Sequence, residues 1–232
     1  MEGEITMVKS FEIKSYDDIR NSLRVRLMDI RENADRMQNL IFEPVGCGLA
    51  LVAYMELPED LSDGGVANIP PSFLKIEGTD RGIILDDAMK GSVDADPAKL
   101  CSIQEVIFGS GDGSEPQNYL EGGTAPEDGL LVLTTKGGRL GASALLYPGM
   151  EARIGEVVGG DYFVLPSSVH EVLILPDRGQ AAPKDLAMMV KDINENTVKP
   201  EDRLCNKVFR FRAKEQELTI ASDPDRNRDI ER

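Results

Sequence analysis

Residues 129–176 read GLLVLTTKGGRLGASALLYPGMEARIGEVVGGDYFVLPSSVHEVLILP, and they hold most of the organised apolar sequence of the chain. Apolar runs of strand length occur at residues 130–134, 162–165 and 169–175. Between the first two runs, Pro148 suits the first turn of a helix, and Gly159 permits the left-handed conformation that ends one. The stretch therefore predicts three buried strands and a helix at the centre of the core.

Upstream of this stretch, the sequence predicts a long helix and then a hairpin. Ser15 stands three residues before Asp18, as in a capping box, and apolar residues follow at steps of three and four. These apolar residues are Ile19, Leu23, Leu27, Ile30, Ala34 and Met37. Residues 49–57 (LALVAYMEL) predict a buried strand, and residues 66–69 predict its hairpin partner. Shorter helices are expected at residues 83–89 and 103–108.

Downstream, Pro183 suits the start of a helix whose predicted buried face carries Leu186, Met189, Val190 and Ile193. Residues 208–211 alternate and predict a final edge strand, whereas residues 214–232 are rich in charges and predict a mobile tail. Residues 109–128 are acidic, rich in glycine and proline, and contain no basic residue. We expect them to form a linker or mobile loop.

This order of elements predicts an α+β fold in which a mixed or antiparallel sheet is packed by several helices. The acidic loop joins two sub-halves, residues 15–108 and 129–213, and the alternatives are two small lobes or one domain with a long surface loop. Neither half alone is expected to cover both faces of its sheet. We therefore expect one cooperative domain over residues 15–213, preceded by a short lead at residues 1–14.

The balance of charge excludes some classes of function. The chain of 232 residues has 41 acidic and 26 basic residues, giving a formal charge of −15. This charge repels phosphate backbones and anionic lipid head groups at long range, which disfavours direct nucleic-acid binding. No apolar run approaches the roughly 18 residues that would span a membrane, and the N-terminus lacks the pattern of a signal peptide. We expect a soluble, cytoplasmic protein.

Metal and cofactor motifs are absent from the sequence. The three cysteines, Cys47, Cys101 and Cys205, are far apart, and His170 is the single histidine. This gives no spacing typical of a zinc site or a redox motif, so we expect reduced thiols, no metal and no cofactor. The glycine pairs at residues 137–138 and 159–160 lack the order of a nucleotide fingerprint and predict turns and helix ends.

Residues 130–176 resemble a family of bacterial proteins of unknown function that is common in anaerobic Gram-positive gut bacteria. The shared pattern is a strand ending in Leu-Thr, then Gly-Ala, Tyr-Pro-Gly and Leu-Pro-Ser-Ser-x-His-Glu-Val. This chain shows it at residues 133–134, 141–142, 147–149 and 165–172. The family has no established activity, cofactor or catalytic residue, so the resemblance implies none. Its members often carry further sequence before the part that matches Ser15, so we expect a short form or a fragment.

The one compact polar cluster consists of Ser167, Ser168, His170 and Glu171. A hydrolytic arrangement would use a serine as nucleophile, His170 as its base and Glu171 to orient the base. Neighbouring residues of a strand point to opposite faces, however, so Glu171 is poorly placed for that role. In the structural alternative, the serines satisfy backbone groups while His170 and Glu171 hydrogen-bond to neighbouring elements. The sequence assigns no catalytic residue.

Three hypotheses of function follow. The leading one is a non-enzymatic binding or regulatory module, with a surface for a protein or small ligand near residues 166–171 and the acidic loop. The second is a hydrolase that uses Ser168 and His170. The third is an acidic mimic of nucleic acid that binds a basic protein partner. Whether the protein is an enzyme stays open, and the lack of a catalytic motif favours a binding role.

Overall fold

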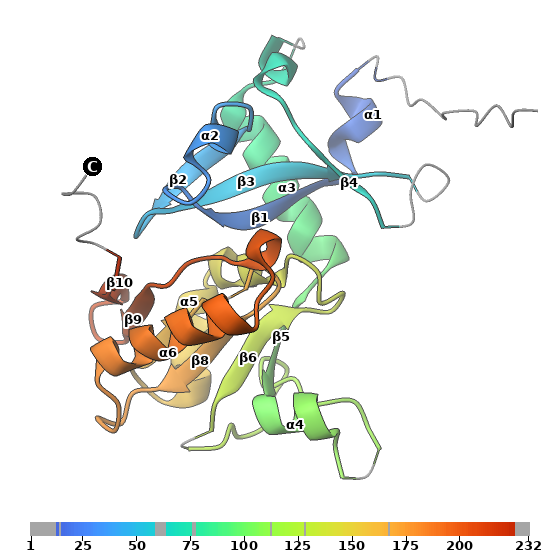
Figure 1. Cartoon of the computed structure of the whole chain (residues 1–232). Coiled ribbons are helices and arrows are strands. Elements are labelled where there is room, and N and C mark those ends of the chain that lie inside the picture. Colours follow the sequence, from blue (N-terminus) through green and yellow to red (C-terminus); the bar gives the residue numbers. More distant parts are fainter. Residues whose placement is uncertain are drawn as a thin grey trace, which may run out of the picture.

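The computed structural model describes residues 13, 15–58, 64–75, 78–111, 113–127, 129–166 and 168–225. It confirms an α+β fold, in which helices pack against two antiparallel sheets instead of one (Figure 1). Most of the predicted N-terminal lead, and Ser167 of the candidate site, lie outside the described residues.

Sheet A is built from β1 (Leu23–Asp29), β2 (Phe42–Gly46), β3 (Leu49–Glu56) and β4 (Val66–Asn68). Sheet B has β5 (Ala98–Ser102), β6 (Leu131–Thr135), β7 (Tyr162–Leu165), β8 (Val172–Pro176), β9 (Val208–Arg212) and β10 (Glu217–Ser222). The α-helices are α1 (Asp17–Arg20), α2 (Ala34–Met37), α3 (Arg81–Ala95), α4 (Ile103–Phe108), α5 (Met150–Val158) and α6 (Pro183–Asn196). The 3₁₀-helices are η1 (Pro71–Lys75), η2 (Gly141–Leu146) and η3 (Pro200–Asp202).

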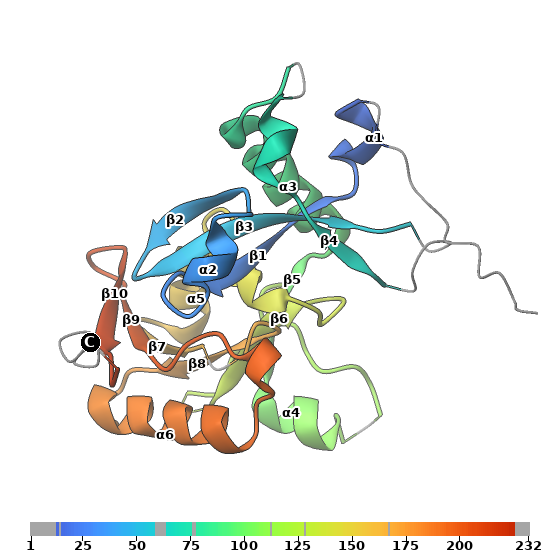
Figure 2. The same cartoon turned by 45° about the horizontal axis from the view of Figure 1, so that its top comes forward.

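The two sheets are layered with helices on several faces, as Figures 1 and 2 show. In sheet A, β3 is central and pairs with β1 on one edge and with β2 and β4 on the other. Helix α3 packs against β1 and β3, and α2 contributes to a small cluster on the opposite face. In sheet B the strand order is β10-β9-β7-β8-β6-β5, and α6 covers one face. The other face of sheet B joins the main core.

One apolar core connects the two sheets. It contains Val25 and Leu51 of sheet A, Leu133 and Phe209 of sheet B, and Ile84 of α3. Burial of such side chains is the main favourable contribution to folding, at about 25 cal/mol per Å² of apolar surface. Cooperative folding of the two sub-halves stays a prediction, and this shared core supports it.

The predicted long helix over residues 15–37 is wrong. Only its two ends, Asp17–Arg20 and Ala34–Met37, are helical, and residues 23–29 between them form β1, which pairs with β3 over its whole length. Leu23, Val25 and Leu27 are buried while Arg24 and Arg26 between them are only partly so, which is the two-residue period of a strand. Leu23 and Leu27 are four residues apart, a spacing that fits the period of a helix as well as that of a strand. The pairing of all seven residues with β3 makes the segment a strand.

Two segments expected to be mobile are partly ordered. In the predicted acidic linker, Tyr119, Leu120 and Ala125 are buried in the main core. The Asn118 side chain accepts a hydrogen bond from the Leu100 backbone N–H (3.0 Å), so this segment covers the outer edge of β5. In the predicted tail, residues 217–222 form β10, which makes β10 and not β9 the edge of sheet B.

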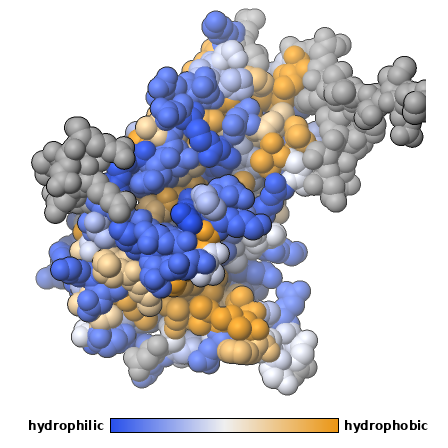
Figure 3. Space-filling view, viewed as in Figure 1, coloured by the Kyte–Doolittle hydropathy of each residue, from blue (hydrophilic) through white to orange (hydrophobic). Residues whose placement is uncertain are grey.

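The other predicted elements differ mainly at their ends. β3, β4, β6, β7, α4 and α5 are confirmed, but α3 runs to Ala95, β8 begins at Val172 instead of residue 169, and β2 and β5 were not predicted. Met189 of α6 is exposed, because the buried face carries Ala187 and Asn194. On α4, the apolar residues Val106, Ile107 and Phe108 are exposed to solvent, and Phe108 is 84% exposed. Apolar side chains gather over this helix in Figure 3.

The buried thiol of Cys205 gives a direct check of the packing. Burial raises the pKa of Cys205 to about 12, and the nearby Asp29 carboxylate adds to the effect. Because the thiolate is the reactive form, we expect Cys205 to resist a thiol reagent in the native protein at about pH 8, whereas the half-buried Cys47 reacts first. Mass spectrometry of the labelled protein with and without denaturant measures this order. Native labelling of Cys205 as fast as that of Cys47 would contradict the packing.

Candidate functional site

His170 lies in the connection between β7 and β8 and joins two other segments. Its Nδ1 atom accepts a hydrogen bond from the Leu140 backbone N–H (3.1 Å), and its Nε2 atom lies 3.2 Å from Oδ1 of Asp202. Because Nδ1 accepts, the ring proton is assigned to Nε2, which donates to the carboxylate. The His170 carbonyl also accepts a hydrogen bond from the Thr134 hydroxyl (2.8 Å). The histidine thus ties the turn after β6 to η3.

The Ser168 hydroxyl forms a hydrogen bond with the backbone of the same connection. Its Oγ atom accepts a hydrogen bond from the His170 backbone N–H (3.0 Å), and its backbone forms an isolated bridge with Arg203. Both ring nitrogens of His170 are engaged elsewhere, so neither is available to Ser168 as a base. Glu171 forms no hydrogen bond or ion pair with the described part of the chain. This geometry supplies no observation in favour of a hydrolase.

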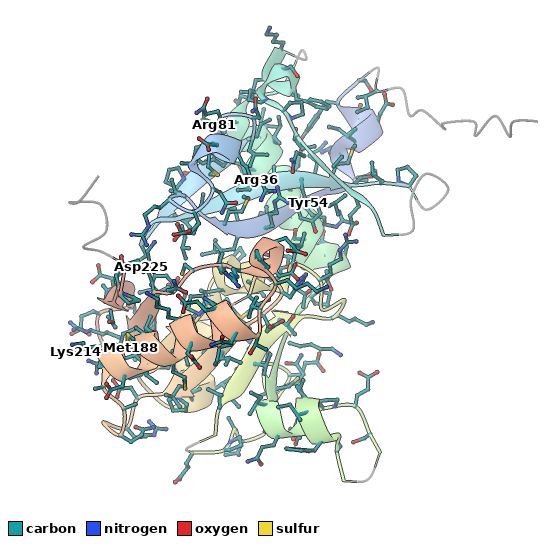
Figure 4. All side chains as sticks on the ribbon, in the orientation of Figure 1. Arg36, Tyr54, Arg81, Met188, Lys214 and Asp225 are labelled. Carbon is teal, nitrogen blue, oxygen red and sulfur yellow. The ribbon has the colours of Figure 1, made fainter. Side chains whose placement is uncertain are left out.

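A larger site lies at the other end of the turn that His170 holds. There a cleft of about 680 Å³ opens between the edge of sheet A and the turn after β6. We call it the inter-sheet cleft. It is lined by Tyr54, Glu56, Leu57, Gly64, Gly65, Val66, Ala95, Asp96, Lys136, Gly137 and Arg139. Tyr54 is labelled in Figure 4, on β3 near the β4 edge.

The carboxylates of the inter-sheet cleft are already occupied, and its cations are not. Glu56 forms an ion pair with Arg24 (2.8 Å between Oε2 and Nη2), and Asp96 accepts a hydrogen bond from the Gly137 backbone N–H (2.6 Å). Among the residues that the structure describes, neither Lys136 nor Arg139 has an ion-pair partner. In a chain with a formal charge of −15, the cleft therefore presents two cations without an ion-pair partner in the described structure, beside one carboxylate, Asp96, that is hydrogen-bonded but not paired with a cation.

Tyr54 adds a hydrogen-bond donor to the wall of the cleft. Burial and the nearby Glu56 carboxylate raise the pKa of Tyr54 to about 12, although the charges of Arg24 and Arg139 act against this. The phenol is therefore protonated at neutral pH and can donate a hydrogen bond to an anionic ligand. Lys136, Arg139 and Tyr54 together form a set of donors suited to phosphate or carboxylate oxygens.

Sequence reasoning missed the inter-sheet cleft, because residues 136–139 (KGGR) predict only a turn. The turn is present: the Gly138 backbone N–H donates to the Thr135 carbonyl (3.0 Å). A usable signal was the placement of two cations around a glycine pair, directly after a buried strand, in an acidic chain. The partner of this turn, Tyr54, lies about eighty residues earlier and cannot be read from local spacing.

Within the described ranges, no group of three or more His, Cys, Asp or Glu side chains could hold a metal ion. The helices placed by the structure include none that combines the length and apolar composition needed to cross a membrane.

Comparison with known proteins places the chain in a family. A family model described as "Family of unknown function (DUF5688)" matches residues 2–213. The chain belongs to this family. The matched range of the DUF5688 family includes both sheets except β10, together with the His170 connection and every residue that lines the inter-sheet cleft. No curated protein and no solved structure matches the chain significantly.

Proposed function

We propose that the protein is a non-enzymatic binding module for a small anionic ligand, and that the ligand binds in the inter-sheet cleft. One observation carries this proposal: Lys136 and Arg139, which lack ion-pair partners in the described chain, converge with Tyr54 on a cleft of about 680 Å³. Volumes of roughly 300–1,000 Å³ are typical of small-molecule sites. The ligand class is a metabolite with phosphate or carboxylate groups.

The geometry explains why an anion binds a chain that is acidic overall. The long-range field repels anions, so recognition depends on short-range, charge-assisted hydrogen bonds from Lys136, Arg139 and the Tyr54 hydroxyl. The ion pair with Arg24 lowers the repulsion of a ligand by Glu56, whereas the hydrogen bond from the Gly137 backbone N–H stabilises the Asp96 carboxylate without removing its charge. The Gly137 and Gly138 backbone leaves room for the ligand to approach.

The double variant Lys136→Gln/Arg139→Gln is expected to weaken ligand binding at least about tenfold, since hydrogen bonds to charged groups contribute about 1.5–3 kcal/mol each. A thermal-shift panel of sugar phosphates, nucleotides and di- and tricarboxylates first identifies anions that raise the Tm of the native protein. Isothermal titration calorimetry of the best anion then compares the native protein with the variant.

A matched control separates the cleft from general charge. The double variant Lys184→Gln/Arg212→Gln removes two exposed cations from α6 and β9 and changes the net charge by the same amount. It is expected to bind as the native protein does. The proposal fails if no anion of the panel raises the Tm, or if the two double variants lose affinity equally.

The setting of this function is also a proposal. The resemblance of residues 165–172 to a bacterial pattern and the free state of the three cysteines support a role in the bacterial cytoplasm. The formal charge of −15 supports a small ligand or a protein as the partner in preference to nucleic acid.

A further inference from the structure

A second, smaller hollow lies between β1, α2 and the segment that follows η3. It has a volume of about 60 Å³, and three arginines from distant parts of the chain line it: Arg26 of β1, Arg36 of α2 and Arg203 after η3. We call it the arginine hollow. In Figure 1, η3 appears in orange-red directly below β1, and Figure 4 labels Arg36 on the neighbouring helix. Leu27, Leu140 and Leu204 provide its apolar lining.

None of the three arginines has a carboxylate partner within the described part of the chain. Arg26 donates to the Asn68 side chain (2.7 Å), Arg36 to the Asn33 side chain (3.2 Å) and Arg203 to the Val198 carbonyl (3.0 Å). These acceptors are neutral, so the three positive charges have no ion-pair partner among the described residues. The one carboxylate in the lining, that of Glu201, is exposed and forms no ion pair with them.

Arg26 is the most strongly perturbed of the three. Its Nε atom is buried and has no hydrogen-bond partner in the described structure. Burial lowers the pKa of Arg26, and the charge of Arg36 lowers it further. A buried, uncompensated charge next to a like charge is unfavourable, and an anion in the hollow would relieve both effects.

We propose that the arginine hollow binds one phosphate group. Guanidinium groups form paired hydrogen bonds with phosphate and carboxylate oxygens, and three of them need more acceptor oxygens than a single carboxylate offers. The volume fits a group of a few atoms, since a water molecule occupies about 30 Å³ of liquid. The phosphate comes either from free inorganic phosphate or from a ligand whose remainder lies in the inter-sheet cleft, because Leu140 of the hollow follows Arg139 of the cleft.

His170 has a positioning role for this site. Its ring holds Leu140 through a backbone N–H and holds Asp202, the residue before Arg203. Ser168 pairs with Arg203 through its backbone, and Val169 lines the hollow itself. Val169, within the pattern at residues 165–172, thus forms part of the wall of the arginine hollow, and Ser168 and His170 hold the segments beside it, which gives these residues a role without catalysis.

Titration of the ¹⁵N-labelled native protein with inorganic phosphate, at constant ionic strength held with sodium chloride, tests the proposal. The backbone resonances of Leu140, Val169 and Leu204 are expected to shift and saturate. Arg36→Gln and Arg203→Gln, which alter half-buried or exposed side chains and are expected to fold, should each weaken phosphate binding about tenfold. Arg212→Gln, at the exposed end of β9, should not.

A second arm uses glycerol 3-phosphate to identify the source of the phosphate. Tighter binding than inorganic phosphate, with the difference lost in Lys136→Gln/Arg139→Gln, assigns the phosphate to a ligand that spans both sites. Equal binding, unaffected by that double variant, assigns it to free phosphate and leaves the hollow independent of the proposed function. The inference is overturned if phosphate produces no saturable shift, or if Arg212→Gln weakens binding as much as Arg36→Gln and Arg203→Gln.

Discussion

Replacing Lys207 with methionine is expected to lower the free energy of unfolding by about 3–5 kcal/mol, the cost of leaving a buried charge without its partner. Lys207 is 4% exposed and Asp29 is fully buried, with 2.5 Å between the lysine Nζ and one carboxylate oxygen. The pair joins the end of β1 in sheet A to the start of β9 in sheet B. The other carboxylate oxygen accepts the backbone N–H groups of Arg31 and Glu32, so Asp29 cannot turn toward solvent without losing both bonds.

Chemical denaturation followed by circular dichroism measures this effect. The double variant Asp29→Asn/Lys207→Met should recover at least about half of the loss, because removing both charges costs less than removing one. The exposed pair Lys90–Asp94 provides the control, and Lys90→Met should change stability by no more than about 0.5 kcal/mol. If Lys207→Met were as stable as Lys90→Met, the ion pair would not hold the sheets together.

The central part of the fold could be predicted because its signals are local. Pro148 and Gly159 mark the ends of α5, and Gly159 has the left-handed backbone (φ 74°) that its position after the helix implies. β3 was equally clear, as an apolar run of strand length before Pro58. These elements could be predicted without knowing which segments they pack against.

The errors concern segments whose structure depends on a distant partner. β1 has apolar residues that fit a helix or a strand, and its pairing with β3, more than twenty residues later, decides the outcome. β10 lies in a segment rich in charges, and its pairing with β9 keeps it ordered where composition predicted a tail. Tyr119 and Leu120 belong to an acidic, glycine-rich segment, yet they fill the core beside β5. Composition averages over residues, whereas packing depends on individual side chains.

For the candidate sites, too, single residues could be found from the sequence, but the residues around them could not. His170 was found because it is the only histidine, but its partners Leu140 and Asp202 are 30 and 32 residues away, so its place in the fold could not be predicted. The cations of the inter-sheet cleft and of the arginine hollow come from five separate positions. Their common feature, the lack of a carboxylate partner among the residues that the structure describes, exists only in the folded chain.

Replacing Gly141 with alanine is expected to lower the free energy of unfolding by about 2–3 kcal/mol, at the upper end of the usual cost of overpacking. A Cβ atom there would lie 2.4 Å from the Thr134 hydroxyl oxygen, 2.6 Å from the His170 carbonyl oxygen and 2.7 Å from the Thr135 backbone nitrogen. Two of these atoms are backbone, so the turn after β6 must move away from the His170 connection.

That movement should reach both binding sites, since Arg139 of the inter-sheet cleft and Leu140 of the arginine hollow directly precede Gly141. Denaturation measures the loss of stability, and the phosphate titration measures the loss of binding on the fraction that remains folded. Gly111→Ala is the control, because no atom lies within 4 Å of its Cβ position and its φ is ordinary, so stability and binding should be retained. Native stability in Gly141→Ala would show that the turn and the His170 connection are not in tight contact, and the positioning role of His170 would then fail with it.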